Sequence, residues 1–380
     1  MLSVGNAELF VTLINRLHAL PVQAGILRQV RHGHDLWIPL FPVCLIVGVN
    51  GFIPGGGFGL STPAEIWKIV PGPVQVYFAV CLIGCAECLV SCARYLRHRD
   101  APQQTSFESQ VIDVEETLGR TLAGEGRYAR MARMPLNECF TIEINEREFT
   151  LSGLPPEWNG LRILHLTDLH FTGTVNRDYF EYVFEEVAKQ EFDMVCFTGD
   201  LLDGNEFVSW IPSTIGRLQA PLGKFFILGN HDWYLDVDSI RDAMICQGWR
   251  DMAGRLQVLD TLGPPLVIGG DERPWMGQHP NFRAGPDPAF RLLLSHTPDN
   301  YSWARTAGVD LMLTGHNHGG QVVLPVIGPV YTPSLHGVRF AGGVFYQTPT
   351  LLFVSRGVGG LHPLRINARP EISLLTLKSA

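Results

Sequence analysis

The feature that most constrains the fold is a sequence pattern that occurs five times, in which a short apolar run is followed directly by Asp, Asn or His. The first run begins at Leu161 and ends in Thr167-Asp168-x-His170. The later runs end in Gly199-Asp200, Gly229-Asn230-His231-Asp232, Ser295-His296 and Gly315-His316-Asn317-His318. Runs of this kind are typical of buried strands. Because ligands of open α/β sheets bind at the carboxyl ends of strands, we expect side chains up to about 150 residues apart to share one site.

Helical patterns separate the first strands, over 179–190 and 237–248. Strands alternating with helices indicate an α/β fold. The alternating stretch Thr141–Leu151 is expected to form an edge strand of the same domain. Four further strands are predicted after His318, completing a second sheet, over 322–324, 342–346, 351–354 and 372–377. We therefore expect a two-sheet β-sandwich flanked by helices, preceded by an N-terminal helical membrane region.

Two apolar stretches, 37–53 and 74–93, lie in the first hundred residues. Each is close to the roughly 20 residues that cross a bilayer as a helix. Pro39 and Pro42 interrupt the first, and Glu87 in the second is costly if it faces lipid. A two-span hairpin is the favoured interpretation. Two alternatives stay open: a pair of buried helices in a soluble domain, or one span beside one interfacial helix.

Basic residues predict the orientation of such a hairpin. Arginines lie before the first stretch and after the second, and the short loop between them carries only Lys68. By the positive-inside tendency both flanks are cytoplasmic. The protein is therefore expected to be a multi-pass protein of the cell membrane with its catalytic domain on the cytoplasmic face. Apolar residues at helical spacing over 9–17 predict a further helix, either interfacial or packed against the others.

These patterns divide the chain into three segments: a membrane region over 1–99, a polar linker with room for one short helix over 100–135, and a catalytic domain over 136–380.

Of the eight cysteines, Cys85 and Cys88 form a CxxC, which we interpret as helix packing and not as a zinc site. The net charge of −8 gives no global attraction for nucleic acid, so no nucleic-acid partner is expected. The membrane is an expected partner.

Seven strand-end side chains offer carboxylate, imidazole and amide ligands without a thiolate. They are Asp168, His170, Asp200, Asn230, His296, His316 and His318. A mixed nitrogen and oxygen set suits Mn, Fe or Zn and is too rich in histidine for a dedicated Mg or Ca site. Seven ligands exceed the need of one ion, so two ions bridged by a carboxylate fit better. Each residue alone has a plainer explanation as a cap or a satisfied polar group, but five coincidences at strand ends favour one shared site.

These blocks, from about Leu161 to Gln321, resemble the complete motif set of the calcineurin-like metallophosphoesterases. The tail from Ser355 to Leu377 is similar to the bacterial membrane-associated branch that contains the YkuE and YaeI phosphoesterases. The resemblance implies that one divalent ion is held by Asp168, His170, Asp200 and His318. It implies that the second ion is held by Asp200, Asn230, His296 and His316, with Asp200 bridging.

The expected chemistry is hydrolysis of a phosphodiester or pyrophosphate bond by metal-bound hydroxide. His231 stands beside the predicted ligand Asn230 and is placed to protonate the leaving group or to stabilise the transition state. Asp203 resembles the family's histidine-orienting carboxylate, with a helix cap as the alternative. Asp232 is interpreted as structural.

The substrate is predicted from location. A cytosol-facing site on a membrane tether favours a phosphorylated head with a lipid tail, and the resemblance extends to enzymes that hydrolyse UDP-2,3-diacylglucosamine in lipid A biosynthesis. The alternatives are a broad-specificity phosphodiesterase or phosphatase and, in a different class, a membrane-tethered binding scaffold, against which the intact ligand set argues. The expected partner of the site is a phosphorylated small-molecule or lipid-linked substrate, and no substrate-binding residue is predicted. Four aromatic residues could line a pocket or simply pack: Trp233, Tyr234, Trp275 and Trp303.

Overall fold

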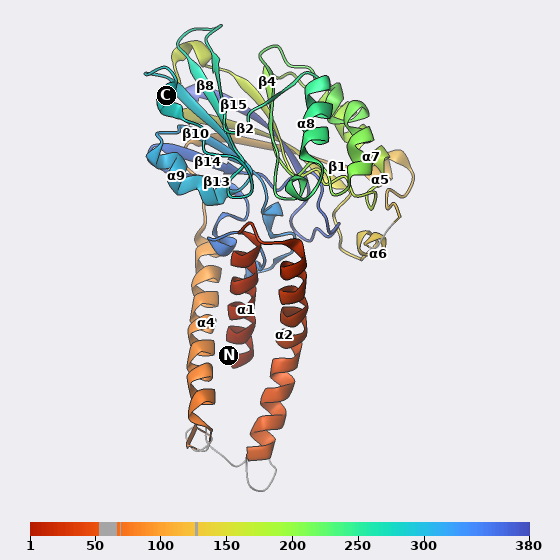
Figure 1. Ribbon diagram of the computed structural model, residues 1–380, viewed down its shortest axis with the longest axis vertical. Coiled ribbons are helices and arrows are strands. Elements are labelled where there is room, and N and C mark those ends of the chain that lie inside the picture. The colour runs from red at the N-terminus through yellow and green to blue at the C-terminus, as the bar shows by residue number, and fades with distance from the viewer. Residues whose placement is uncertain (53–66, 69, 126–127) are drawn as a thin grey trace. The chain divides into compact units, whose positions relative to one another are not determined.

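A computed structural model describes residues 1–52, 67–68, 70–125 and 128–380 (Figure 1). The chain divides into two compact units. The helical unit comprises Met1–His98 and Pro325–Arg339, and the catalytic unit comprises Arg99–Leu324 and Phe340–Ala380. Pro325–Arg339 belongs to the helical unit although it follows His318 closely in the chain, so the catalytic unit is formed from two separate stretches of sequence.

Three long helices form the helical unit: α1 (Leu2–His18), α2 (Ala24–Phe52) and α4 (Gly72–Arg97). α1 approaches α4 so closely that a Cβ atom on Gly5 would collide with the carbonyl oxygen of Cys81. The Asn6 side-chain oxygen accepts hydrogen bonds from Trp37 Nε1 of α2 at 3.2 Å and from Tyr77 Oη of α4 at 2.5 Å. One buried amide thus joins all three helices.

Among the described residues, α4 alone is long and apolar enough to cross a membrane. The predicted span 74–93 lies inside α4. The predicted span 37–53 lies in α2, which contains Pro39 and Pro42, except that residue 53 falls outside the described residues. Two spans and a cytoplasmic catalytic domain therefore stay predictions.

The catalytic unit is built on a seven-stranded sheet in the order β1-β2-β15-β3-β4-β5-β6. β3 to β6 are parallel, and β1 runs antiparallel to β2. The bounds are β1 Gln104–Asp113, β2 Thr141–Leu151, β3 Arg162–Leu166, β4 Met194–Thr198, β5 Gly223–Ile227, β6 Trp249–Asp251 and β15 Glu371–Ser379.

A second sheet has six strands in the order β13-β14-β10-β9-β8-β7. Its strands are β7 Leu256–Leu259, β8 Leu266–Asp271, β9 Phe290–Ser295, β10 Leu311–Thr314, β13 Gly343–Gln347 and β14 Thr350–Val354. The short strands β11 (Val323–Leu324) and β12 (Gly328–Pro329) lie between β10 and β13 in the chain. The remaining helices are α5 Val114–Leu118, α6 Ala129–Ala132, α7 Arg177–Val187, α8 Val237–Cys246 and α9 Tyr301–Thr306.

The side chains of the strands alternate between two cores, which makes the unit a sandwich. Leu164 and Leu166 of β3 share a cluster with α7 and α8, whereas Ile163 packs with the second sheet. Met312 of β10 packs with α9 on the far side of that second sheet. The layers are therefore helices, sheet, sheet and helix (Figure 1). The predicted sandwich flanked by helices is confirmed.

Four predictions about strands need correction. The stretch Thr141–Leu151 was expected at an edge, but as β2 it lies between β1 and β15. The stretch 322–324 was expected in the second sheet, but β11 pairs with β12 in a separate two-stranded sheet. β15 was expected in the second sheet, but it lies in the first, parallel to β2 and antiparallel to β3. The range 100–135 was expected to be a linker, but residues 104–113 form β1, the edge strand of the first sheet. Most side chains of β1 are exposed, which explains a polar composition that resembles a linker.

Candidate metal centre

The polar residues that end five strands gather at one place because the sandwich aligns the carboxyl ends of β3, β4 and β5 with those of β9 and β10. The first three are parallel neighbours in one sheet, and the last two are parallel neighbours in the other. Several of the strand-end residues adopt positive φ, namely Asp168, His170, Asp200, His316 and His318. Non-glycine residues rarely adopt this conformation, and such strain is concentrated at functional sites.

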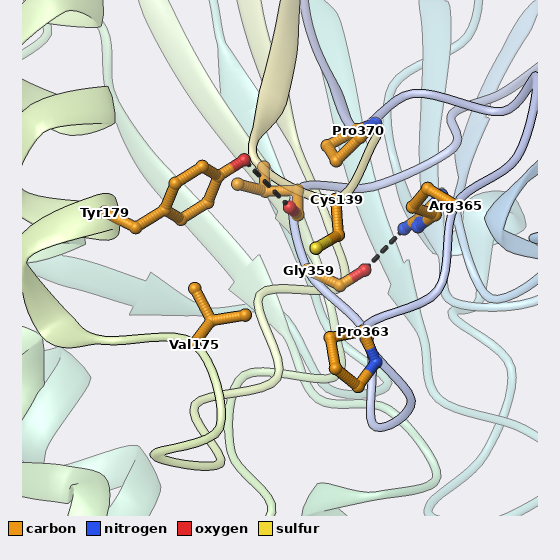
Figure 2. Close-up of a pocket in the computed structure, with 9 residues that line it drawn as sticks. Cys139, Val175, Tyr179, Gly359, Pro363, Arg365 and Pro370 are labelled. Atoms are coloured by element: carbon orange, nitrogen blue, oxygen red, sulfur yellow. Dashed lines mark hydrogen bonds between the residues drawn. The ribbon is translucent and has the colours of Figure 1, made fainter. Parts of the chain in front are cut away.

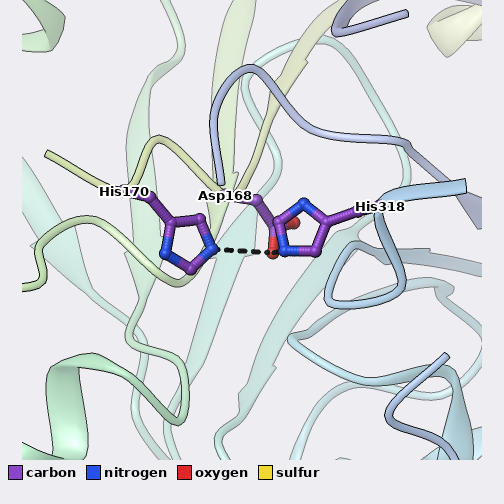
Figure 3. Close-up of side chains that lie close together, drawn as sticks. All are labelled: Asp168, His170 and His318. Atoms are coloured by element: carbon purple, nitrogen blue, oxygen red, sulfur yellow. Dashed lines mark ion pairs between the residues drawn. The ribbon is translucent and has the colours of Figure 1, made fainter. Parts of the chain in front are cut away.

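The first group joins Asp168, His170 and His318, whose ligand atoms all lie within 4.8 Å of one another (Figure 3). Both imidazoles point toward the same carboxylate. His170 Nε2 lies 3.8 Å and His318 Nε2 3.6 Å from Asp168 Oδ1. The carboxylate is fixed from its other side, since the His316 backbone N–H donates to Asp168 Oδ2 at 2.9 Å.

The second group joins Asp200, His296 and His316. Asp200 Oδ2 lies 3.3 Å from His296 Nε2 and also 3.4 Å from His170 Nε2 of the first group. Asn230 completes the set, with Oδ1 3.0 Å from His296 Nε2. All seven predicted ligands are therefore brought together, and Asp200 lies between the two groups as predicted for a bridging ligand.

Whether this cluster can hold cations is indicated by the hydrogen bonds of His296 and His170. In both rings Nε2 faces the cluster, and the partner of Nδ1 shows which nitrogen carries the proton. His296 Nδ1 donates to the Thr198 carbonyl at 2.8 Å, so in the neutral ring the lone pair of Nε2 faces the oxygens of Asn230 and Asp200. His170 Nδ1 likewise bonds Asp203, and among the described residues its buried Nε2 has no hydrogen-bond partner. Lone pairs that converge on oxygen acceptors are stabilised by a cation between them, and a carboxylate or carbonyl behind the ring is the usual support of a ligating histidine. The residues fit divalent ions.

Asp203 contacts two histidines at once. Its Oδ2 lies 2.8 Å from His170 Nδ1 and its Oδ1 lies 2.5 Å from His231 Nδ1. Burial opposes ionisation of Asp203, but His231 and His170 outweigh it and hold the pKa of Asp203 below its usual value. Burial alone would lower the pKa of His231, whereas the charges of Asp203 and Asp200 raise it. These contacts match the orienting role expected of Asp203 and not the helix-cap alternative.

His231 lies at the edge of the cluster, with its side chain 26% exposed. One of its ring nitrogens lies within 4.8 Å of a ring nitrogen of His170 and a carboxylate oxygen of Asp200, although His231 was not predicted to be a ligand. Its backbone N–H donates to Asp200 Oδ1 at 2.9 Å. His231 is thus held beside the Asp200 carboxylate with its ring partly open to solvent, an arrangement that suits a proton donor to a substrate.

Asp232 faces away from solvent and organises the backbone. Its carboxylate accepts hydrogen bonds from the N–H groups of Leu201, Leu202 and Gly229 at 2.9–3.2 Å. These contacts connect the loop after β4 with the loop after β5. They support the structural interpretation of Asp232.

Arg365 is a residue of the site that sequence reasoning missed. It is 1% exposed, and its guanidinium donates to the His318 carbonyl at 2.9 Å and to the Gly359 carbonyl (Figure 2). A second guanidinium nitrogen lies 3.1 Å from His318 Nδ1. The Arg365 side chain also lines a small pocket together with Cys139 and Tyr179. A lone arginine in the tail carries no motif that would reveal these contacts.

The four aromatic residues that could line a pocket differ in exposure. Trp275 is only 6% exposed, and its ring packs 5.0 Å from that of His316. Trp303 stacks on His279 at 4.0 Å, with ring planes inclined by 6°. Trp233 and Tyr234 pack against each other, and Tyr234 is 43% exposed. Trp275 therefore packs on a predicted ligand, and Tyr234 is the most open of the four to solvent.

Comparison with known proteins gives one family. Residues 161–320 match the family described as calcineurin-like phosphoesterase. The chain is 30% identical to the uncharacterized metallophosphoesterase YkuE of Bacillus subtilis, over 69% of this chain and 93% of that protein. It is 29% identical to the phosphodiesterase YaeI of Escherichia coli, over 57% and 82% of the two chains. It is 28% identical to a transmembrane protein with metallophosphoesterase domain of Danio rerio, over 64% and 59%.

Proposed function

Because this chain belongs to the calcineurin-like phosphoesterase family, and is therefore a phosphoester-hydrolysing enzyme, we propose that it cleaves phosphodiester or pyrophosphate bonds at a centre of two divalent ions. The observation that carries the proposal is the position of Asp200, within 3.4 Å of histidines from both ligand groups. Asp168, His170 and His318 would hold one ion with Asp200, and Asn230, His296 and His316 would hold the other. Mn, Fe and Zn suit this donor set equally.

Divalent ions in this site would act as Lewis acids, lowering the pKa of a water molecule and neutralising charge on the phosphate oxygens. The protein's own part is to orient and to move a proton. Asp203 holds the rings of His170 and His231 by their Nδ1 atoms. Since the neighbouring carboxylates raise the pKa of His231, this ring retains a proton that it can give to the leaving oxygen.

The proposal includes association with a membrane. Helix α4 has the length and apolar composition of a span, and one relative is named a transmembrane protein. Both observations support membrane association. A second span through α2 and a catalytic unit on the cytoplasmic face are parts of the proposal that rest on the apolar stretch and the arginines of the sequence alone.

For the substrate, a phosphodiester has the best support, because one relative is named a phosphodiesterase. The narrower prediction, UDP-2,3-diacylglucosamine in lipid A biosynthesis, rests on resemblance and on the membrane tether, and none of the relatives named above carries that activity in its name. A membrane-tethered binding scaffold is disfavoured, since all seven ligand positions are intact and grouped.

The test uses the full-length protein in detergent with Mn. Release of nitrophenol from bis(p-nitrophenyl) phosphate is measured beside release of UMP from UDP-2,3-diacylglucosamine, with His231→Ala and the metal-free protein as controls. We expect metal-dependent cleavage of the generic diester that falls about 100-fold or more in His231→Ala. Cleavage of neither compound, with less than one bound ion per chain, would contradict the proposal. UMP release as the faster reaction would support the lipid A substrate.

A further inference from the structure

The segment Pro325–Arg339, here called the 325–339 loop, belongs to the helical unit although it follows His318 closely in the chain. The Thr332 backbone N–H donates to the buried Asn15 side chain of α1 at 3.2 Å. Tyr331 packs edge-on against His18, with ring centroids 6.0 Å apart, and Gly328 faces the Tyr95 ring of α4. The loop is thereby fixed to the C-terminal turns of α1 and α4.

The tip of the loop exposes apolar side chains to solvent. Val326 is 66% exposed and Ile327 is 45% exposed, and Leu335 on the other limb is also 45% exposed. Val326 has a φ of 70°, which a β-branched residue rarely adopts. Strained backbone is concentrated at functional sites, and exposed apolar side chains that lie together mark interaction surfaces.

Basic residues surround this end of the helical unit. α1 ends with Arg16 and His18, and α4 ends with Arg94 and Arg97. The first turns of α2 add Arg28 and Arg31, the latter within electrostatic reach of Tyr331. Asp35 of α2 is acidic and lies 3.9 Å from Arg31. An apolar tip among arginines, next to the end of a candidate span, has the composition of a surface that contacts anionic lipid.

We propose that the 325–339 loop inserts Val326 and Ile327 into the interfacial layer of a bilayer, with the surrounding arginines on anionic headgroups. The proposal rests on the membrane association in the proposed function and adds a second contact besides α4. The occupant is the lipid surface and not a protein partner, because the loop is held at the C-terminal turns of α1 and α4. If α4 spans a bilayer, this is where it leaves the hydrocarbon layer and enters the headgroup layer.

The experiment places the photoreactive residue p-benzoylphenylalanine at one position of the full-length protein in nanodiscs of phosphatidylcholine with phosphatidylglycerol. Val326 is the test position and Ile327 repeats it, in case the bulky residue perturbs the turn. Leu89, 65% exposed in α4, reports whether α4 lies in lipid. Leu262, 50% exposed in the catalytic unit, is the matched control for non-specific labelling. Lipid adducts are counted by mass spectrometry after illumination.

We expect lipid adducts at Val326 and Ile327 about fivefold above those at Leu262, decreasing when phosphatidylglycerol is omitted. If Leu89 labels lipid while Val326 and Ile327 match Leu262, the loop proposal is wrong and membrane association stands. If Leu89 also fails to label lipid, membrane association itself is wrong, and the loop proposal falls with it. Protein adducts in place of lipid adducts at Val326 would equally overturn the lipid assignment.

Discussion

Asp203 and His231 form the shortest contact between acidic and basic side chains at the site, with 2.5 Å between Oδ1 and Nδ1. The same carboxylate holds His170 through its other oxygen, so one residue orients a predicted metal ligand and a predicted proton donor. Its charge raises the pKa of His231, which burial alone would lower. A change at Asp203 should therefore alter the pH dependence of catalysis as well as its rate.

Replacing Asp203 by Asn removes that charge while keeping the shape of the side chain. Protonated His231 is present below its pKa and is lost as the pH rises through it, so a lower pKa moves the basic limb of the kcat/KM profile to lower pH. We expect the basic limb to move to lower pH and the rate to fall by about 10- to 100-fold. A pH–rate profile of the metal-loaded variant measures both the position of the basic limb and the rate. An unchanged basic limb would show that His231 is not the proton donor.

Asp200 should matter more than any other ligand because it lies between the two groups. Asp200→Asn is expected to reduce the metal content well below that of the wild type. The loss of activity should exceed the about 10- to 100-fold loss that is typical when a residue hydrogen-bonded to a metal ligand is replaced. Metal per chain is measured by plasma mass spectrometry after gel filtration. Asp271→Asn, which changes a fully buried carboxylate outside the cluster, is the matched control and should retain the metal. Equal retention by both variants would argue against a bridging role.

The strand-end residues could be predicted from sequence because each ligand pair lies in one local segment. Asp168 and His170 follow β3 directly, as His316 and His318 follow β10. A short apolar run followed by a polar motif therefore reveals both the strand and its functional end.

Pairing partners and long-range contacts could not be predicted in the same way. β15 has the mainly apolar sequence of a buried strand, and nothing local indicates that it inserts between β2 and β3. β1 is an exposed edge, so its composition matches that of a linker. Arg365 acts through His318, which lies 47 residues earlier, and such a contact exists only after the fold has formed.

In the helical unit, Gly5 sets how closely α1 and α4 can approach. A Cβ atom there would overlap the Cys81 carbonyl, and one on Gly84 would lie 2.6 Å from the Gly5 carbonyl. Gly5→Ala should therefore separate the helices and lower the thermal unfolding temperature of the detergent-solubilised protein. Gly33→Ala in α2 meets nothing within 4 Å and should be neutral or stabilising by up to about 1 kcal/mol. Equal unfolding temperatures for the two variants would contradict this packing.

Glu371 should make stability depend on pH. It is 2% exposed at the start of β15 and accepts from the Arg356 backbone and guanidinium at 2.8 Å and from Asn145 at 2.7 Å. Burial opposes its ionisation, but Arg356 and Arg147 outweigh burial and lower the pKa of Glu371 from 4.5 to about 2. A carboxylate with a depressed folded-state pKa stabilises the fold above its unfolded pKa. That stabilisation, about 3 kcal/mol, is lost as the pH falls from about 4.5 toward about 2.

Glu371→Gln should therefore lower the free energy of unfolding by about 3 kcal/mol near neutral pH, because buried Arg147 loses the carboxylate 3.7 Å away and Arg356 loses one of its two carboxylates, retaining Glu143 at 2.6 Å. The difference from the wild type should narrow by about 1 kcal/mol between about pH 6.5 and about pH 4, since the wild-type carboxyl begins to protonate in the unfolded chain. Denaturant titrations at the two pH values measure this difference. Glu148→Gln is the control, because its partner Lys378 lies 3.9 Å away on the surface and such pairs contribute at most about 1 kcal/mol. A difference that does not change with pH would mean that Glu371 acts by packing and not through its charge.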